Sequence, residues 1–468
     1  MAELSSRMQK PASAILPKIA ATIADRTNAT PKIDLATAEN WLIRPELAEI
    51  YRDALQNNLT LADLSYPDGF GGDPKLQEAL AAFFNKYFSP LAPVQPSHIV
   101  VTPGASNCLD SLLFSICEAG DSVLVLAPFW NGFDVHFMLR PNIKIVPVFT
   151  TSVSFLDRPS DLLSESLVPA LEAALESCEN KSRAKAFVIT NPHNPFARCY
   201  PEPVLREAIQ WCAERGLHYI SDEVYALSDF SAAPSPVQEN GFCPGTPPAT
   251  PNGTSNHGTE PDPTPFISAL SIALPADKTP PISVIWSTSK DLGSSGLRIG
   301  AHVSRPSSLS SSQSSSQSSS QSPSSLSLLS TSLALLSTTQ LPTISMLLTR
   351  YLLTSPRFDA LVVANRRRLR EHHDTVARRL RAWGVPFVPA TSGPYVLAGL
   401  GAAVGGGSGD VVDVLRREAM VLVSPGKAFH FPGADDAQGW VRITFAVPGD
   451  MLREGLDRIG RALGFEGA

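Results

Sequence analysis

Short runs of β-forming residues alternate with helical patterns along most of the chain, and this alternation restricts the fold more than any other feature of the sequence. Between the first two runs, the apolar residues Leu109, Leu112 and Leu113 recur at the spacing of one buried helix face. Strands joined through helices tend to pair in parallel, so the sequence predicts an α/β fold with a mainly parallel central sheet flanked by helices. The candidate strands are HIVVT (98–102), SVLVLA (122–127), IKIVPVF (143–149), AFVIT (186–190), HYISD (218–222), SVIWS (283–287) and RIGAHVS (298–304).

A different pattern follows residue 345. A basic helical run from Arg366 to Arg381 precedes three strand-like segments, PYVLAGL (394–400), MVLVS (420–424) and WVRITFAV (440–447). We expect a smaller α+β domain formed by the N- and C-terminal parts of the chain. His372 and His373, within the basic run, are predicted to be solvated. The predicted boundaries are 1–65 for an N-terminal arm and part of the small domain, 66–345 for the large domain and 346–468 for the C-terminal small domain.

Two segments depart from these patterns in composition. Residues 231–265 contain nine prolines in 35 positions, and 14 of the 19 residues in 307–325 are serine. Neither segment carries enough apolar surface to offset the conformational entropy lost on folding, so both are predicted to be disordered surface insertions. The glycine-rich stretch GAAVGGGSGD (401–410) lacks GxGxxG spacing and is interpreted as a turn.

The overall composition argues against several classes of function. The 468 residues include 38 basic and 44 acidic side chains, and the resulting net charge of −6 argues against binding nucleic acid or a membrane surface through bulk charge. The apolar runs fall well short of the roughly 18 residues that a membrane span needs, so we expect a cytoplasmic protein. The six cysteines form no CxxC pair, which favours free thiols over a disulfide framework or a metal site.

The segment SVIWSTSKDLGSSGLRIG (283–300) contains the most informative chemical signal. Lys290 follows a buried strand, where partial desolvation would lower the pKa of its amine and make it a nucleophile for carbonyl compounds. Ser287 lies three residues before it and Arg298 eight residues after it, and a hydroxyl and a cation at these spacings can hold a phosphate. Taken alone, the segment also fits an ordinary surface lysine after a strand.

Polar residues follow other predicted strands at the same end, which is where ligands bind in open α/β sheets. Asp222 ends HYISD, and an acid leaving an apolar strand needs a cationic partner such as a protonated ring nitrogen; Tyr225 follows three residues later. Asn194 lies in a proline-restricted turn after AFVIT. In VTPGASN, Ala105 and Ser106 begin a helix whose free backbone N–H groups offer a phosphate cradle.

Together these motifs resemble the pyridoxal-phosphate-dependent class I/II aminotransferases of the aspartate-aminotransferase fold (fold type I). Within that family the chain is most similar to 1-aminocyclopropane-1-carboxylate (ACC) synthase and its fungal relatives, from about Ile33 to Phe465. The resemblance implies that Lys290 forms the Schiff base with pyridoxal phosphate and later moves the α-proton, while Asp222 pairs with the pyridine nitrogen. It also implies contacts of Tyr225 and Asn194 with the ring oxygen, of Ala105, Ser106, Ser287 and Arg298 with the phosphate, and of Trp130, in PFWNGFD, with the ring face.

Three further positions bear on the substrate. Arg442, in GWVRITFAV, matches the arginine that binds the substrate α-carboxylate, and Glu39, in AEN, is implied to approach the substrate amine or side chain. Phe70 aligns with a tyrosine that reaches the cofactor from the neighbouring subunit, so its missing hydroxyl departs from the family pattern, and Tyr66 is the nearest substitute. The resemblance therefore implies a homodimer with shared active sites and a small amino-acid substrate.

The expected activity is that of an ACC-synthase-like aminotransferase-family enzyme acting on an α-amino acid or an intermediate derived from one, through an external aldimine and a Cα carbanion. The alternative is a β/γ-eliminating lyase, such as a carbon–sulfur lyase or ACC synthase, in secondary metabolism. A non-catalytic interaction protein with the same fold is disfavoured by the intact motif set. Residue by residue, the alternatives are a core position for Trp130, turn positions for Tyr225 and Asn194, a helix cap for Glu39, and Lys427 in place of Lys290.

Overall fold

The computed structural model of the protein describes most of the chain from residue 32 onwards. The described residues are 4–5, 8–9, 11–17, 20, 32–150, 163, 165–231, 264–275, 279–305, 327–401, 410–432 and 438–465. The insertion predicted at 307–325 lies outside these residues, as do nearly all of 231–265 and of the glycine-rich stretch.

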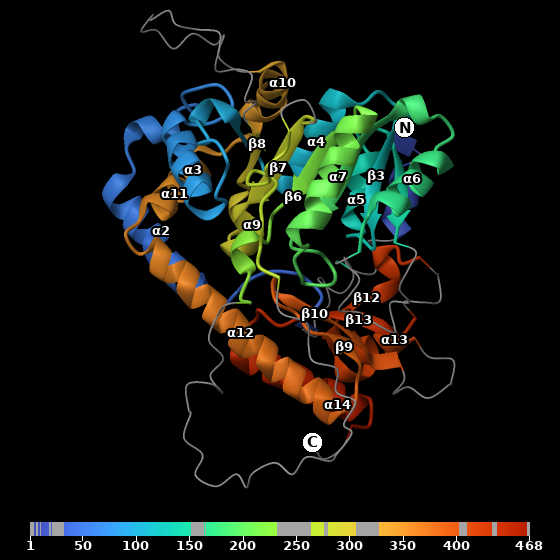
Figure 1. Ribbon diagram of the computed structural model, residues 1–468. Helices are drawn as coiled ribbons and strands as arrows, with labels where there is room; N and C mark the ends of the chain where they lie inside the picture. Colours follow the sequence, from blue (N-terminus) through green and yellow to red (C-terminus); the bar gives the residue numbers. More distant parts are fainter. Residues whose placement is uncertain are drawn as a thin grey trace, which may run out of the picture.

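A seven-stranded sheet forms the centre of the larger part of the molecule (Figure 1). Its strand order is β2-β8-β7-β6-β5-β3-β4. The prediction of a mainly parallel sheet is confirmed, with β8 antiparallel to both of its neighbours. The strands are β2 (Ile99–Thr102), β3 (Ser122–Ala127), β4 (Lys144–Phe149), β5 (Ala184–Thr190), β6 (His218–Asp222), β7 (Ile282–Ser287) and β8 (Gly300–Ser304).

Helices cover both faces of this sheet. Successive side chains of each strand point to opposite faces, so a strand that is apolar throughout needs cover on both sides. In β3, Val123 and Val125 belong to one apolar cluster, whereas Leu124 and Leu126 belong to another. The first cluster includes side chains of α4 (Ala105–Ile116), α5 (Gly132–Met138) and α10 (Leu328–Ser337). The second includes side chains of α2 (Arg44–Asn58), α3 (Pro74–Tyr87), α6 (Val168–Ser177), α7 (Glu202–Arg215) and α11 (Thr343–Thr354).

The smaller part contains a four-stranded antiparallel sheet in the order β12-β13-β10-β9. A parallel pair of short strands, β1 (Ile33–Asp34) and β11 (Val421–Leu422), attaches the N-terminal segment to the C-terminal part. The expected MVLVS strand is divided between β11 and β12. The sheet strands are β9 (Phe387–Val388), β10 (Tyr395–Gly399), β12 (Ser424–Pro425) and β13 (Trp440–Thr444).

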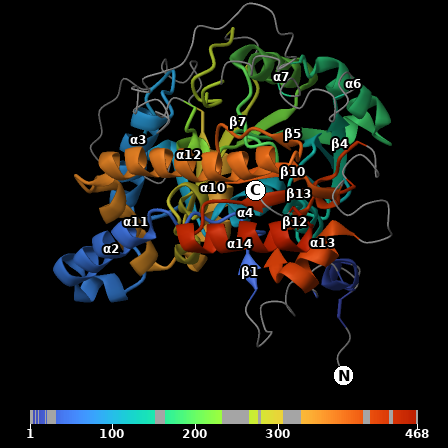
Figure 2. The same cartoon turned by 90° about the horizontal axis from the view of Figure 1, so that it is seen from below.

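The long helix α12 (Phe358–Ala382) links the two parts and lies beside α14 (Gly449–Ala462) (Figure 2). The expectation that both histidines of α12 are solvated is wrong for His373, which is 5% exposed, with its Nε2 accepting the backbone N–H of Ala390 at 3.2 Å. Aromatic side chains from outside the helix cover this ring, with the centroids of Phe230 and Phe445 at 5.7 and 5.9 Å from its own. Within the described part of the chain, no helix has both the length and the apolar character that crossing a bilayer requires.

Candidate active site

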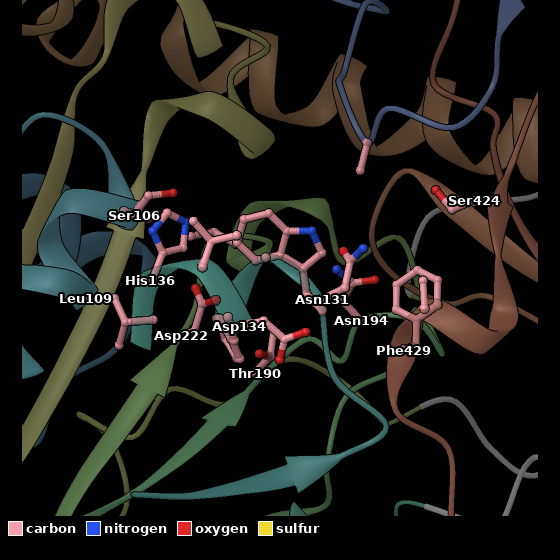
Figure 3. Close-up of a pocket in the computed structure, with 18 of the residues that line it drawn as sticks. Ser106, Leu109, Asn131, Asp134, His136, Thr190, Asn194, Asp222, Ser424 and Phe429 are labelled. Carbon is pink, nitrogen blue, oxygen red and sulfur yellow. The ribbon is translucent and has the colours of Figure 1, made fainter. Parts of the chain in front are cut away.

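A cavity of about 960 Å³ opens at the carboxyl edge of the large sheet, with residues of the smaller part on its other side (Figure 3). Strands β2, β3, β5, β6 and β7 end at this edge. Because β8 is antiparallel, its beginning, near Arg298, lies there too. Ten of the predicted site residues line the cavity: Ala105, Ser106, Trp130, Asn194, Asp222, Tyr225, Ser287, Lys290, Arg298 and Arg442.

Lys290 lies in α9 (Thr288–Asp291), the short helix that follows β7. Its Nζ donates a hydrogen bond to the carbonyl oxygen of Ala38 at 2.7 Å. Burial lowers the pKa of this amine to about 8, and the positive charges of Arg442 and Arg298 act in the same direction against the opposing charges of Glu39 and Asp222. About a tenth of the amine is therefore uncharged at pH 7, against roughly one part in 2,500 for an ordinary lysine. The arrangement provides a nucleophilic amine at neutral pH.

Asp222 ends β6, and its Oδ1 is buried without a hydrogen-bond partner among the described residues. Burial raises the pKa of its carboxyl group to about 7, although the N–H of Val224 and the charge of Lys290 oppose the shift. A buried carboxylate oxygen without a partner is costly, so this position suits a ligand that brings a cationic N–H group. A protonated pyridine nitrogen is such a group.

The residues predicted to hold a phosphate meet at the start of α4. Gly104 has a φ of +85°, and a side chain there would collide with the guanidinium of Arg298. A side chain at Gly300 would likewise collide with the backbone of Gly104 and Ala105. Arg298 donates from Nη1 to the carbonyl oxygen of Ser295 at 2.8 Å, which holds its cation beside the uncapped helix start. The two glycines thus keep open a cradle of backbone N–H groups beside a cation, as a phosphate requires.

Ser287 has a partly structural role at this place. It is 1% exposed and caps α9 by accepting the N–H of Ser289 at 3.1 Å. Ser289 also lines the cavity, although none of the sequence motifs indicated this residue. Its position directly before Lys290 is the only sequence signal that points to it.

Arg442 is a buried cation whose partners are all uncharged. It is 4% exposed, and it donates from Nη1 to Oδ1 of Asn194 at 2.9 Å and from Nη2 to the carbonyl oxygen of Ala36 at 2.8 Å. Its Nε has no partner among the described residues, and no described carboxylate lies within ion-pair distance of it. Burial lowers the pKa of the guanidinium. Since an unpaired buried cation is costly, the site suits an anionic group of a ligand.

The aromatic side chains that line the cavity include two of the predicted site residues, Trp130 and Tyr225. The half-buried ring of Trp130 packs edge-on against Phe133, with centroids 5.9 Å apart. Tyr225 is 3% exposed and lies edge-on to Tyr395 at 5.5 Å. Burial raises the pKa of the Tyr225 phenol to about 12, so its hydroxyl keeps its proton at neutral pH. Tyr395, in PYVLAGL, is a further neighbour that no sequence motif indicated.

Glu39 and Phe70 do not line the cavity of their own chain. Glu39 accepts hydrogen bonds from Arg44 and Ser295. Burial alone would raise the pKa of Glu39, but these hydrogen bonds outweigh it and lower the pKa below the ordinary value. Phe70 is 39% exposed and Tyr66 97% exposed, so both are open to a partner.

The raised pKa of Asp222 predicts a stability difference that depends on pH. In the cofactor-free protein, the contribution of this group to the free energy of unfolding is fully present below pH 3.8, the pKa of its carboxyl group in the unfolded chain. This contribution is lost as the pH rises through about 7, the pKa of the group in the folded protein. Asp222→Asn should therefore raise the free energy of unfolding at pH 8, by about 1–3 kcal/mol, and by less at pH 5. Urea unfolding at both pH values measures this.

A matched control is Asp121→Asn. Asp121 is also buried, but the hydrogen bond from Arg183 lowers its pKa against the effect of burial. This variant should be less stable than the wild type at pH 8, because it loses an ion pair instead of an unpaired charge. Equal losses of stability in both variants would contradict the assignment of Asp222 as an acid whose Oδ1 lacks a partner among the described residues.

Comparisons with known proteins agree with this geometry. The family model for aminotransferase class I and II matches residues 32–459. A probable aminotransferase, aclI, from Aspergillus oryzae is 38% identical, covering 99% of this chain and 98% of the relative. ACC synthase 1 from Oryza sativa is 28% identical, covering 87% and 74% respectively.

Among solved structures, an aspartate aminotransferase variant from Thermus thermophilus superposes with a TM-score of 0.68. At 22% identity, with 99% of this chain and 100% of that chain covered, this likeness shows the fold. The family is shown by the extent of the family match and by the identity to the A. oryzae relative. The chain belongs to the aminotransferase class I and II family, whose members are pyridoxal-phosphate-dependent enzymes.

Proposed function

We propose that this protein binds pyridoxal phosphate through Lys290 and transfers the amino group of an α-amino acid or of a closely related intermediate. The observation that carries the proposal is that one cavity holds both Lys290, with a pKa near 8, and the buried acid Asp222, whose Oδ1 has no partner within the ranges the structure describes. The names of the fungal relatives also favour transamination.

The residues present fit this cofactor at both of its ends. The cradle at Ala105 and Ser106, with Arg298, would hold the phosphate, and Asp222 would hold the ring nitrogen. When bound, pyridoxal phosphate supplies an electron sink for the negative charge that develops at the substrate Cα as its proton leaves. Trp130 would cover the ring face, and Tyr225 and Asn194 would donate to the ring oxygen.

The chain's own groups would then orient the substrate and move its proton. Arg442 would bind the α-carboxylate, because its guanidinium is buried, held by Asn194, and without a carboxylate partner in the described part of the chain. With the substrate held there, the uncharged amine of Lys290 would take the proton from Cα and later return a proton. Tyr225, protonated at neutral pH, would act as a hydrogen-bond donor.

We further propose that the site is completed in a homodimer. Its support is the exposure of large apolar side chains in one segment of the chain: in η1 (Leu61–Leu64), Leu61 is 88% and Leu64 72% exposed, and Phe70, six residues after η1, is 39% exposed. In a shared site, Phe70 from the neighbouring copy would offer a ring face without a hydroxyl. Sedimentation of the holoenzyme would test the dimer.

A second candidate is a β/γ-eliminating lyase, because ACC synthase 1 from rice matches most of the chain. A screen of α-amino acids and their thioether conjugates against the holoenzyme separates the two reactions. Transamination should convert the bound cofactor to its amine form and release a keto acid, which is visible as loss of its long-wavelength absorbance and by mass. Release of pyruvate or ammonia without that conversion would instead establish elimination.

A further inference from the structure

The residue after the lysine, Asp291, is a buried acid that the reaction as described does not use. It is fully buried, and its carboxylate accepts three hydrogen bonds. The donors are the N–H of Leu227 at 3.0 Å, the hydroxyl of Ser228 at 2.7 Å and Nε1 of Trp286 at 3.0 Å. A carboxylate with all of its partners inside the protein is held in one orientation.

Two of these donors belong to the turn that carries Tyr225. Leu227 and Ser228 lie in η4 (Ala226–Ser228), directly after Tyr225, and the N–H of Ser228 donates to the carbonyl oxygen of Tyr225 at 2.9 Å. The Asp291 carboxylate therefore connects the turn after β6 to the turn after β7. These are the two turns that bring Tyr225 and Lys290 to the cavity.

The backbone of Asp291 makes a third connection. Its carbonyl oxygen accepts from Nδ2 of Asn40 at 3.4 Å and from Nδ2 of Asn365 at 3.5 Å. Asn40 is 1% exposed and lies two residues after Ala38, whose carbonyl oxygen accepts from the Lys290 amine at 2.7 Å. The N-terminal segment, the lysine turn and α12 thus meet at one residue.

We propose that Asp291 is a positioning residue, which fixes the separation between the Lys290 amine and the Tyr225 hydroxyl by tying their two turns together. This inference rests on the proposed function, because it concerns how these two groups face the cofactor. The role depends on hydrogen-bond geometry and not on negative charge. An asparagine side chain can accept from Leu227 and Trp286 on its oxygen and donate from its nitrogen to the Ser228 hydroxyl.

Three holoenzyme variants test the proposal, with cofactor affinity measured by fluorescence titration and turnover measured on a substrate found in the screen. Asp291→Ala should lower turnover by about 100-fold, because misplacing a catalytic group by about 1 Å has an effect of this size. It should also weaken cofactor affinity and move the pH midpoint of the bound cofactor's absorbance. Asp291→Asn should restore both readouts to within a few-fold of the wild type. Asp121→Ala, at a buried acid outside the cavity, should leave them unchanged.

Two results would overturn the proposal. If Asp291→Asn is as impaired as Asp291→Ala, the Asp291 carboxylate acts through its charge. If Asp291→Ala behaves like Asp121→Ala, the Asp291 side chain has no role at the site. Should Asp291→Ala fail to fold, Ser228→Ala removes a single partner and should give a smaller loss of the same kind, and an unchanged absorbance midpoint and turnover would then refute the proposal. Failure of the wild type to take up pyridoxal phosphate would refute the proposed function itself, a result that is separate from any variant.

Discussion

Lys290→Ala should lower turnover by about 10⁴-fold or more, because the variant loses both the amine that would hold the cofactor and the group that would move the α-proton. The pKa near 8 makes the expected pH dependence specific. The rate at which the cofactor-free protein captures pyridoxal phosphate should rise with pH to a midpoint near 8, since only the uncharged amine attacks the aldehyde. An unperturbed lysine would give a midpoint near 10.4.

Borohydride reduction of the holoenzyme, followed by peptide mapping, locates the amine directly. The label should lie on the peptide that contains Lys290 and should be lost in Lys290→Ala. Lys427 provides the matched control, because it also borders the cavity but is exposed and paired with Asp410. Lys427→Ala should still carry the label at Lys290. A label on Lys427, or no label at all, would contradict the assignment.

Arg442→Gln should lower kcat/KM for α-amino acids by about 10²–10³-fold, the range found when one member of a buried charge pair is removed. The loss should depend on the substrate carboxylate. The comparison compound is the amine obtained when the α-carboxylate of the amino acid is replaced by hydrogen. Wild type and variant should react with this amine at similar rates. Steady-state rates for both compounds with both proteins form a double-mutant cycle, in which the coupling energy reports the Arg442–carboxylate contact.

A second readout distinguishes this role from a structural one. The positive charge of Arg442 lowers the pKa of Lys290, so its removal should move the midpoint of cofactor capture to higher pH. Arg370 offers a control, because this arginine does not line the cavity and its guanidinium donates to the backbone carbonyl oxygens of Phe230 and Ser231. Arg370→Gln should leave the midpoint in place. Equal loss of activity toward both substrates in Arg442→Gln would show that the variant had only damaged the fold.

Local sequence patterns predicted most of the large sheet. The apolar runs at 122–127 and 218–222 coincide with β3 and β6, and the stripe of Leu109, Leu112 and Leu113 is buried on α4. The antiparallel direction of β8 was not predictable in the same way, because alternating and continuous apolar runs look alike in either direction. The burial of His373 was missed for a related reason, since a charged helix says little about which residues another element will cover.

Each candidate site residue that follows a strand could be recognised in the sequence, because the carboxyl ends of parallel strands meet at one edge and a polar residue after an apolar run is conspicuous there. The sequence by itself therefore determined the fold class, the family and the chemical types at the edge of the sheet. The tertiary structure alone decided their partners: Arg442 on Asn194, Lys290 on Ala38, and Asp291 on Ser228, contacts that span 248, 252 and 63 residues of sequence. Such contacts depend on how separate elements pack, and the resulting burial lowers the pKa of the Lys290 amine and leaves Oδ1 of Asp222 without a partner among the described residues.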